Sequence, residues 1–598
     1  MATESFFSNA SLAYLASAGA GKDGKTYSIK PTDGSGDFTF SRGSNLAATR
    51  VGPTGLIEKG RENVLTYSNQ FDPNWQGNNA VAILGYADRN GGTNAWLLRE
   101  QGGLIQHYIR QSSGLYSGIG TFSFYAKKKD YDWVQFARSG DGGDYANFNI
   151  SNGTLGNVSG AGIIDRKIDS VGNGWYRCSV TYIFASNSFV GIALIRSDVS
   201  SRYEVYQGDN TSGTYIQDAQ VEQGLAATDY IESGATTGKA GLLEDEPRFD
   251  YSGGATCPSL LLEPSRTNLI PYSEYIEEAD IIDAAQVLTT TDATPEGTNN
   301  ARVLAYNGGT NQHYMSFVPS VTNGETYTFS VFLKKKELRY VALIFLNDYA
   351  GRFFDLETGT ILGTTGGTLV DSKIENFGNG WYRCSITDVA TSTSKFSGVY
   401  LSDNGTALGP FVPTGNDGVY IYGYQVEQGS YPTSYIPNHS GGSVTRGQDE
   451  METAISSRFS TQSFSFFADY VVSQASNKSF PVISLDISGT TNDISIYLNG
   501  YVGANLYLGS TNGGYIFGSS TNDGVNVGSQ SKICVTYDGD EISYYINGAL
   551  YGSTTGVTFD NADVAVKFSS NRHIFELKKY IDFPEALSQA DAITLTTL

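Results

Sequence analysis

One eight-residue sequence occurs twice in this chain, and this repeat constrains the fold more than any other feature. Residues 172–179 and residues 378–385 both have the sequence GNGWYRCS. A repeat that contains Trp and Cys is not expected by chance, so the flanking sequence should repeat as well. It does so at matched spacing, in the pairs TFSFYAKKK (121–129) and TFSVFLKKK (328–336), VEQG (221–224 and 426–429), and NVLTYS (63–68) and NLIPYS (268–273).

The repeat divides the chain into domains. Two copies of one module occupy residues 61–236 and 266–440. Each copy is as long as a complete domain, which distinguishes the pair from a short solenoid repeat. The other segments are predicted to be an N-terminal segment (1–60), a connector (237–265), a polar linker (441–455) and a C-terminal domain of unrelated sequence (456–598).

Composition and alternation predict β-structure throughout. The chain contains 40 Tyr, 31 Phe and 70 Gly, and aromatic side chains favour strands while Gly favours turns. Apolar and polar residues alternate in 121–126 and in 328–333, and many short strands between turns are typical of a jelly-roll β-sandwich. Alternate apolar residues in 464–472 indicate a further sandwich in the C-terminal domain. We therefore predict an all-β protein with two tandem jelly rolls and a C-terminal β-sandwich.

Charge and cysteine content restrict the partners. The formal net charge of −22 argues against nucleic acid, because a phosphate backbone would be repelled. No apolar run is long enough to cross a membrane, and the N-terminal sequence has no basic lead-in, so we expect neither membrane insertion nor a secretory signal. Four Cys suit folding in a reducing cytoplasm. Alternation in WYRCSV places Cys178, and by repetition Cys384, on the core face of its strand.

Several motifs, inside and outside the repeat, carry a resemblance. FTFSR (38–42), EPRFDY (246–251) and LLLEPSRTNLIPYSE (260–274) resemble a recurrent segment of tailed-bacteriophage virion proteins. YIYGYQVEQGSYPTSYIP (420–437) is similar to the carbohydrate-binding-type jelly roll that those proteins carry next. KICVTYDGDEISYYINGALYG (532–552) is similar to laminin-G-like, concanavalin-type sandwiches. The chain departs from the usual pattern because residues 61–236 insert an extra copy of the module.

The resemblance implies a function. It predicts a virion structural protein, a head or tail fibre, assembled in the bacterial cytoplasm, attached through residues 1–60 and often homotrimeric. The jelly rolls would form a stalk, and the C-terminal sandwich would contact host-surface glycans. One alternative is a capsid decoration protein that binds no ligand. A depolymerase tailspike is the other, but it would need β-helix rungs with paired acids, so we predict no enzymatic activity.

The repeated motif supplies the candidate glycan-binding residues. Trp175 and Trp381 lie on the strand face opposite the cysteines, where an exposed indole ring could stack on a sugar. Arg177 and Arg383 share that face and could orient the tryptophans by cation–π contact. The alternative is that each Trp packs beneath a loop or a neighbouring domain, and the repetition of the motif is explained equally well by such a structural role.

Acidic and histidine residues supply the remaining candidates. Asp538, Asp540 and Asp486 are the candidate ligands of a calcium ion, the only cofactor left open, although Asp-Gly-Asp is also a common turn sequence. The repeated pairs Glu222 and Glu427, and His107 and His313, are expected to make structural hydrogen bonds. We predict no catalytic residues.

Overall fold

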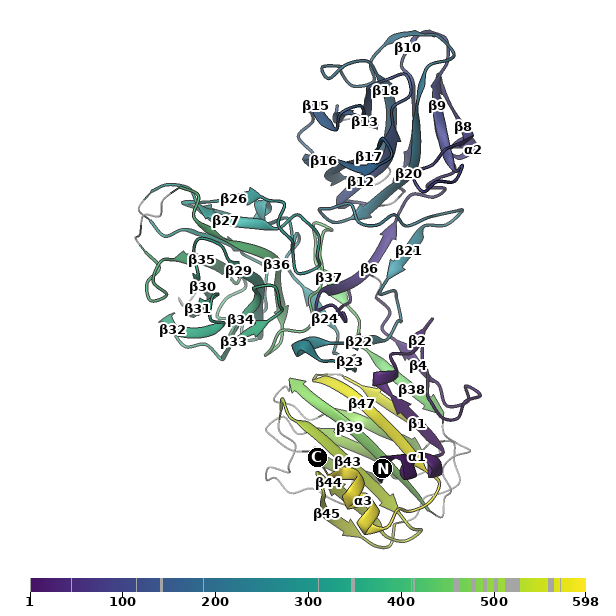
Figure 1. The fold of residues 1–598 in the computed structure, drawn as a ribbon. Helices are drawn as coiled ribbons and strands as arrows, with labels where there is room; N and C mark the ends of the chain where they lie inside the picture. Colours follow the sequence, from purple (N-terminus) through teal and green to yellow (C-terminus); the bar gives the residue numbers. More distant parts are fainter. Residues whose placement is uncertain are drawn as a thin grey trace.

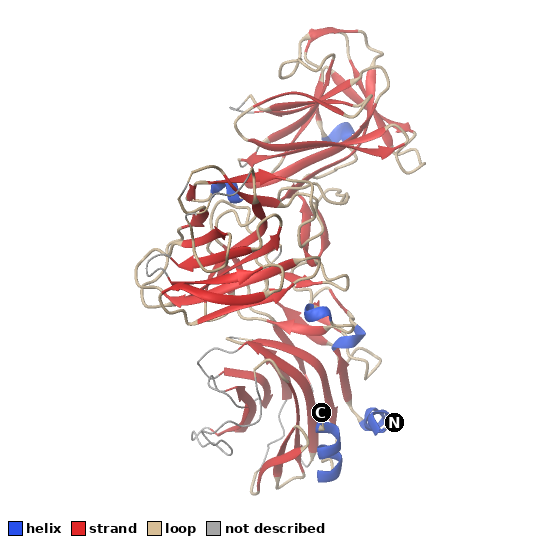
Figure 2. Cartoon of the chain, turned by 60° about the vertical axis from the view of Figure 1, so that its left-hand side comes forward, coloured by secondary structure: helices blue, strands red, loops and turns tan. Residues whose placement is uncertain are grey.

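The structure is a computed structural model that describes residues 2–44, 46–114, 116–139, 143–185, 188–309, 311–345, 350–409, 411, 415–454, 463–474, 480–487, 492–498, 504–510, 527–557, 564–570 and 572–597. Strands make up nearly all of its secondary structure, which confirms the predicted all-β class (Figure 2). Three lobes are visible in Figure 1: module 1 (61–236), module 2 (266–440) and a sandwich that contains the C-terminal residues, the terminal sandwich. The helical elements are short: α1 (Ala2–Asn9), η1 (Ala16–Ala18), α2 (Phe71–Asn74), η2 (Ser252–Gly254), η3 (Ile276–Glu278) and α3 (Gln589–Thr596).

Module 1 is a sandwich of two antiparallel sheets. Over the described residues one sheet has the order β15-β14-β13-β18-β11-β7, and the other has the order β16-β17-β12-β20-β9-β8. Alternate apolar side chains such as Phe122, Phe124, Cys178 and Val180 fill the space between them. The strands are β7 (Gln76–Asn78), β8 (Ala80–Tyr86), β9 (Ala95–Glu100), β11 (Tyr108–Ser112), β12 (Gly118–Lys127), β13 (Trp133–Ser139), β14 (Tyr145–Asn149), β15 (Thr154–Ser159), β16 (Ile163–Gly172), β17 (Trp175–Phe184), β18 (Phe189–Ile195) and β20 (Gly213–Gln223).

Module 2 repeats this topology strand for strand. Its sheets have the orders β32-β31-β30-β35-β28-β25 and β33-β34-β29-β36-β27-β26 over the described residues. The register shift between Ser123 and Tyr125 of β12 recurs between Ser330 and Phe332 of β29, so the duplication preserves even the irregular pairing. The strands are β25 (Ile281–Asp283), β26 (Ala285–Thr289), β27 (Arg302–Tyr306), β28 (Tyr314–Phe317), β29 (Thr326–Lys335), β30 (Tyr340–Phe345), β31 (Ala350–Asp355), β32 (Thr360–Gly366), β33 (Asp371–Asn376), β34 (Trp381–Val389), β35 (Ser397–Ser402) and β36 (Gly418–Gln428).

The terminal sandwich is assembled from distant parts of the sequence. Its sheets have the orders β22-β23-β47-β39-β43-β44-β45, with β1 on β47, and β2-β3-β4-β38-β46-β40-β41-β42 over the described residues. The strands are β1 (Leu12–Leu15), β2 (Gly21–Lys22), β3 (Lys25–Thr26), β4 (Phe38–Ser41), β22 (Arg248–Asp250), β23 (Ser259–Leu262), β38 (Glu450–Ala454), β39 (Phe464–Gln474), β40 (Phe480–Ile487), β41 (Asn492–Leu498), β42 (Ala504–Ser510), β43 (Gln530–Tyr537), β44 (Ile542–Ile546), β45 (Ala549–Thr554), β46 (Val564–Ser569) and β47 (Ile574–Phe583).

This pairing corrects the predicted domain boundaries. Residues 1–60 were expected to form a separate segment, but β1–β4 lie in the terminal sandwich, where Tyr14 and Phe38 pack in the same core as Phe568 and Tyr580. The sandwich therefore does not begin at residue 456. The physical reason is that β38 and β47 each have an edge with which a strand from elsewhere in the sequence can pair, as β4 and β23 do, and burial of the apolar faces of those strands stabilises the distant pairing.

A narrow β-ribbon joins module 1 to the rest of the chain. β6 (Ile57–Asn63) pairs with both β5 (Thr49–Val51) and β21 (Gly238–Gly241), so the chain enters and leaves module 1 along adjacent strands. Module 2 has a comparable pair of β24 (Arg266–Asn268) and β37 (Val444–Arg446). Figure 1 shows the ribbon between the upper lobe and the other two, with both chain ends in the terminal sandwich.

Five buried charges hold these segments together, and we call them the central ion cluster: Arg42, Arg248, Arg446, Glu263 and Asp449. The carboxylate of Glu263 is 2.6 Å from Arg248 and 2.7 Å from Arg446. Asp449 is 3.4 Å from Arg42 and also pairs with Arg248. The cluster joins the N-terminal segment, the connector and the linker, and the side chains are almost completely inaccessible.

A second group of buried charges, the module junction, fixes module 1 against module 2. Lys59 on β6 lies 2.6 Å from Glu296 and 3.2 Å from Glu274, both in module 2. Arg61 lies 3.2 Å from Glu296 and 3.8 Å from Glu222 of module 1. Burial lowers the pKa of Lys59, but the two glutamates outweigh that effect and the pKa is raised.

The central ion cluster predicts a loss of stability in acid. Burial raises the pKa of Glu263, but Arg446, Arg248 and hydrogen bonds from Ser434 outweigh burial and lower it from 4.5 to about 2. A carboxyl whose pKa is lower in the folded state stabilises the fold above pH 4.5, and that contribution is lost as the pH falls toward 2. We expect the melting temperature to fall across this window.

Glu263→Gln tests the assignment. The variant leaves Arg446 without its carboxylate partner and Arg248 with Asp449 alone, so it should lose roughly 3 kcal/mol of unfolding free energy at pH 7 and show a weaker pH dependence. Thermal melts between pH 7 and pH 2.5 measure both effects, and Glu278→Gln, which changes an exposed carboxyl, is the control. Equal melting curves for Glu263→Gln and the parent would contradict the role given to the cluster.

Candidate functional site

The repeated tryptophans are buried and offer no ring face to a sugar. Trp175 is 0% exposed and Trp381 is 2% exposed. Trp175 packs with Tyr125 and Ala95, and the indole nitrogen of Trp381 donates to the carbonyl of Ala293 at 3.2 Å. The prediction that they bind glycans by stacking is therefore wrong for the structure described, because loops and tyrosines cover their outer faces. The alternative, a Trp packed beneath neighbouring residues, is confirmed.

The arginines of the motif differ between the copies. Arg383 is buried and donates to the carbonyl of Thr433 at 2.6 Å and to the hydroxyl of Ser330 at 2.9 Å. Arg177 is half-buried and donates to the hydroxyl of Ser123 at 3.0 Å. Each guanidinium lies over an aromatic ring, at 5.3 Å from Tyr125 and 5.4 Å from Phe332. The rings beneath them are therefore not those of the motif tryptophans; Arg177 lines a cleft of about 1010 Å³, whereas Arg383 lines a cavity of about 140 Å³.

The repeated glutamates lock the end of each module. Glu222 accepts hydrogen bonds from the amide of Gln220 at 2.6 Å and from the backbone and hydroxyl of Thr228 at 2.7 and 2.6 Å. Glu427 accepts the same set from Gln425 and Thr433. These contacts tie the segment after VEQG to the strand before it. The predicted structural role of the glutamates is confirmed.

The ring nitrogens of the repeated histidines also make hydrogen-bond contacts with backbone carbonyl groups. The two ring nitrogens of His107 lie 2.8 Å and 3.2 Å from the carbonyls of Asn79 and Tyr206. Those of His313 lie 2.8 Å and 3.1 Å from the carbonyls of Ala284 and Phe411. Both are buried, as expected for hydrogen-bonded structural histidines. The motif cysteines Cys178 and Cys384 lie in the two cores, where burial raises the pKa of each thiol, and this confirms their predicted core position.

Asn63 and Asn268 are the residues that sequence reasoning missed. The side chain of Asn63 donates to the carbonyls of Ala219 and Ile231 at 3.1 and 2.9 Å and accepts from two backbone amides. Asn268 makes the same four contacts in module 2. The signal was present, since Asn begins both NVLTYS and NLIPYS, but a single polar residue does not show which backbone groups it will meet.

Loss of this side chain should unfold the module that contains it. Asn63→Ala leaves four buried backbone groups without their partner, and each costs about 1–3 kcal/mol. We expect the unfolding free energy to fall by at least about 3 kcal/mol in urea denaturation, and Asn268→Ala to behave in the same way. Asn94→Ala removes an exposed side chain and should change little. A loss below about 1 kcal/mol for both buried variants would refute the assignment.

Two of the three calcium candidates, Asp538 and Asp540, hold the backbone of a turn. The carboxylate of Asp538 accepts the backbone amides of Asp540 and Glu541 at 3.1 and 2.8 Å, and that of Asp540 accepts the amide of Gly556 at 3.0 Å. These contacts are those of an Asx turn, which is the alternative given for this sequence. Asp486 lies on β40, but its side chain falls outside the described residues. Among the described residues no group of three His, Cys, Asp or Glu side chains is arranged to hold a metal ion.

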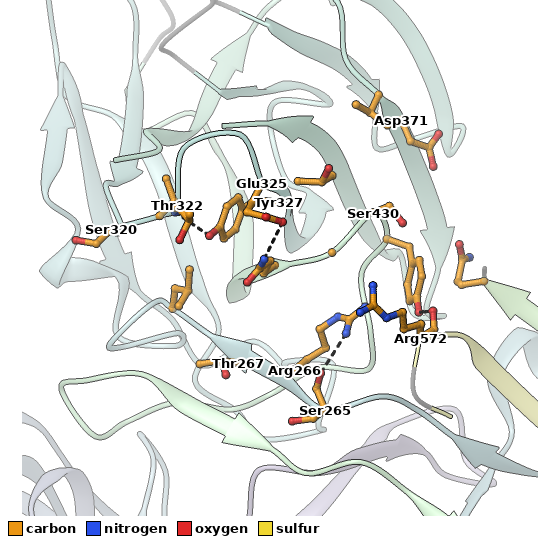
Figure 3. A pocket seen from close by; sticks show the side chains of 18 of the residues that line it. Ser265, Arg266, Thr267, Ser320, Thr322, Glu325, Tyr327, Asp371, Ser430 and Arg572 are labelled. Atoms are coloured by element: carbon orange, nitrogen blue, oxygen red, sulfur yellow. Dashed lines mark hydrogen bonds between the residues drawn. The ribbon is translucent and has the colours of Figure 1, made fainter. Parts of the chain in front are cut away.

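A polar cleft lies between module 2 and the terminal sandwich, and we call it the seam cleft. It has a volume of about 1160 Å³. Figure 3 shows hydroxyl, carboxyl and guanidinium groups around it, with Thr322 and Tyr327 on one wall and Arg266 and Arg572 on the other. Within it the amide of Gln428 donates to Glu325 at 3.1 Å and the backbone of Thr322 donates to the hydroxyl of Tyr327 at 2.9 Å.

A second large cleft borders module 1, and we call it the module 1 cleft. It has a volume of about 1010 Å³ and lies between the outer face of β16, β17 and β12 and residues 296–299 of module 2. Lys167 crosses the cleft edge and donates to the carbonyl of Asn299 at 2.8 Å. Clefts of this size between domains are common ligand sites. Both are lined by groups that can donate and accept hydrogen bonds.

Comparison with known proteins finds similarity in structure alone. No family model matches the sequence, and no curated protein matches it. The carbohydrate-binding module CBM40 of the Ruminococcus gnavus IT-sialidase, bound to α2,3 sialyllactose, is 13% identical, with 23% of this chain and 84% of that chain covered and a TM-score of 0.20. The CBM22 tandem domain of Paenibacillus barcinonensis Xyn10C is 8% identical, with 65% of this chain and 100% of that chain covered and a TM-score of 0.21.

A third solved structure is similar over a quarter of the chain. Domain 4 of an extracellular arabinanase from Geobacillus stearothermophilus, in complex with arabinotriose, is 16% identical, with 25% of this chain and 73% of that chain covered and a TM-score of 0.22. Likenesses of this size support no argument about a ligand, so the functional argument depends on the geometry of this chain. Among the described residues, no helix is long and apolar enough to cross a membrane.

Proposed function

We propose that the protein is a structural component of a bacteriophage virion, a head or tail fibre whose β-sandwiches contact host-surface glycans. The observation that carries the proposal is the arrangement of three β-sandwiches in a fixed array by two groups of buried ion pairs. Such an array displays its outer domains at a distance from its point of attachment. The resemblance of FTFSR, EPRFDY and the segment from 260 to 274 to virion proteins supports the same assignment.

The strand pairing supports a different choice of attachment end and outer end from the one that the sequence suggested. Residues 12–41 and the terminal sandwich are one unit, so the former cannot sit at the attachment point while the latter is outermost. We assign the terminal sandwich to the attachment end of the fibre and module 1 to the projecting end. In Figure 1 module 1 is the lobe farthest from the terminal sandwich. The chains would associate as a homotrimer, and linked copies would strengthen weak glycan contacts by avidity.

The proposal includes no enzymatic activity. Hydrolysis of a glycosidic bond needs two carboxyl groups placed across that bond. The glutamates that recur in both modules are occupied by hydrogen bonds from their own loops. A capsid decoration protein that binds no glycan is the second candidate, and it is favoured by the structural role of the recurring Trp, Glu and His residues.

A glycan array separates the two candidates. The purified full-length chain should bind at least one class of host-derived glycan in a multivalent format, and removal of the glycan from host cells should reduce adsorption of the particle. Incubation with host polysaccharide should release no new reducing ends. Absence of binding to every host glycan would favour the decoration protein.

Electron microscopy tests the position on the virion. Gold-labelled antibodies against module 1 should mark the free ends of projecting fibres rather than the particle surface. Label confined to the capsid surface, or no label on purified virions, would contradict a fibre.

A further inference from the structure

The same sheet face has different surroundings in the two modules. In module 2 the outer face of β33, β34 and β29 lies against the terminal sandwich and the connector. Tyr431 packs against Leu261 and Ile574 and donates its hydroxyl to the carbonyl of Arg572 at 2.5 Å. Ser434 donates its backbone amide and hydroxyl to Glu263 at 2.8 and 2.6 Å. Module 2 is thereby docked through the segment that follows VEQG.

Module 1 lacks the residues that make this docking contact in module 2. Alignment of the two VEQG segments places Ala226 where module 2 has Tyr431, and Asp229 where it has Ser434. Ala226 is half-buried and too small to reach a neighbouring domain, and Asp229 is exposed. Among the described residues, none from the terminal sandwich lines the module 1 cleft. The face that carries a domain in module 2 therefore remains open in module 1.

The open face carries a ladder of cross-strand polar pairs. The register of β16 and β17 sets Asp165 opposite Thr181, Lys167 opposite Ser179 and Asp169 opposite Arg177. Directly opposed residues share one face of a sheet, so these groups form two adjacent rows along the cleft. Thr121 and Thr228 extend the polar surface on either side. The ladder offers donors and acceptors at close intervals.

Module 2 contains the same ladder, but the docked domain divides it. Its pairs are Asp371 with Thr387, Lys373 with Ser385 and Glu375 with Arg383. Asp371 lines the seam cleft, whereas Glu375 lines a separate cavity of about 140 Å³, and Gln474 of the terminal sandwich borders both. A ligand that extends along all three pairs fits module 1 and is excluded from module 2.

The equivalent arginines Arg177 of module 1 and Arg383 of module 2 differ in their hydrogen bonds. In module 2 Arg383 is held by the carbonyl of Thr433 as well as by Ser330. Within the described part of the chain, the guanidinium of Arg177 donates to Ser123 and not to the carbonyl of Thr228, which corresponds to that of Thr433, and its Nε has no hydrogen-bond partner. Arg177 therefore retains donor groups at the floor of the cleft.

The charges that line the cleft indicate the class of ligand. Arg166, Lys167 and Arg177 are matched by Asp165, Asp169 and Asp229, and Arg61 is paired with Glu296. A lining in which cations and carboxylates balance gives no net attraction for a phosphate or an acidic polymer. Closely spaced acceptors and donors do suit vicinal hydroxyl groups, because each hydroxyl both donates and accepts.

We propose that the module 1 cleft binds a neutral oligosaccharide along the ladder of β16 and β17, and that module 2 serves as the structural copy. This proposal rests on the proposed glycan contact and locates it. Asp165, Asp169, Arg177 and Ser179 hydrogen-bond the sugar hydroxyls, and Ala226 and Ala227 leave the room that the sugar occupies. The inserted copy of the module thus carries the binding function of the chain.

Two cleft-filling variants test the location. Ala227→Trp fills the module 1 cleft, and Ser430→Trp fills the seam cleft, so each variant is the control for the other. The full-length chain is titrated by calorimetry with neutral tetra- to hexasaccharides drawn from gluco-, manno-, xylo- and galacto-series. We expect binding of at least one series, a loss of at least tenfold in affinity with Ala227→Trp, and a change of less than twofold with Ser430→Trp. Arg177→Met should also lose at least tenfold, with an unchanged melting temperature.

The outcomes are distinguishable. Binding that Ser430→Trp abolishes and Ala227→Trp preserves would overturn the assigned location while the proposed function stands. Binding confined to sialylated or uronate-containing oligosaccharides, added as a separate panel, would overturn the neutral class. No binding to either panel by the parent chain would contradict the glycan contact itself. If Ala227→Trp does not fold, protection of residues 165–169 and 225–231 from hydrogen exchange on addition of the sugar to the parent chain decides the location.

Discussion

The pairing of buried charges from distant segments is the interaction on which the rest of this structure depends. Arg248 of the connector and Arg446 of the linker share one carboxylate, that of Glu263, and Asp449 binds Arg42 of the N-terminal segment. A buried ion is costly without a partner, so none of these segments can leave without exposing an uncompensated charge. The cluster thus specifies which strands complete the terminal sandwich and where module 2 attaches. The module junction of Lys59, Arg61 and Glu296 then fixes module 1 against module 2.

The sequence predicts local structure well here, because local structure repeats. Alternation around Cys178 and Cys384 correctly places both thiols in their cores, and the polar groups of Glu222, Glu427, His107 and His313 are satisfied as expected. The sequence does not reveal which residues cover the outer face of each sheet, the face directed away from the core of its module. Trp175 and Trp381 lie opposite the core, which predicts exposure for an isolated sheet, yet both are buried by loops and tyrosines. Burial on that face depends on contacts with residues distant in the sequence, and such contacts leave no periodic pattern of apolar residues from which they could be predicted.

The domain boundaries were missed for the same physical reason. Strand β1 pairs with β47 and β4 pairs with β38, at sequence separations of several hundred residues. The local sequence around β1 or β4 does not indicate which strand will pair with it. An edge strand is completed by backbone hydrogen bonds, and any extended segment can supply these. The charged residues of FTFSR and EPRFDY were visible as motifs, but their meaning as two halves of one ion cluster required the structure.

Duplication explains how one fold can serve a structural role in module 2 and be free for the binding role that we propose for module 1. The two modules share their strand order, the register shift in β12 and β29, the hydrogen-bonded glutamates Glu222 and Glu427, and the buried asparagines Asn63 and Asn268. Each copy therefore has its own complete set of stabilising contacts, and its surface can differ from that of the other copy. In module 2 Tyr431 commits the outer face to domain packing, and the ladder of Asp371, Lys373 and Glu375 is divided. In module 1 the replacement of that tyrosine by Ala226 leaves the equivalent ladder continuous. Because Tyr431 docks module 2 and the ion pairs of Lys59 and Arg61 hold module 1, the face of β16 and β17 in module 1 is not used for assembly and can present its polar groups to a ligand.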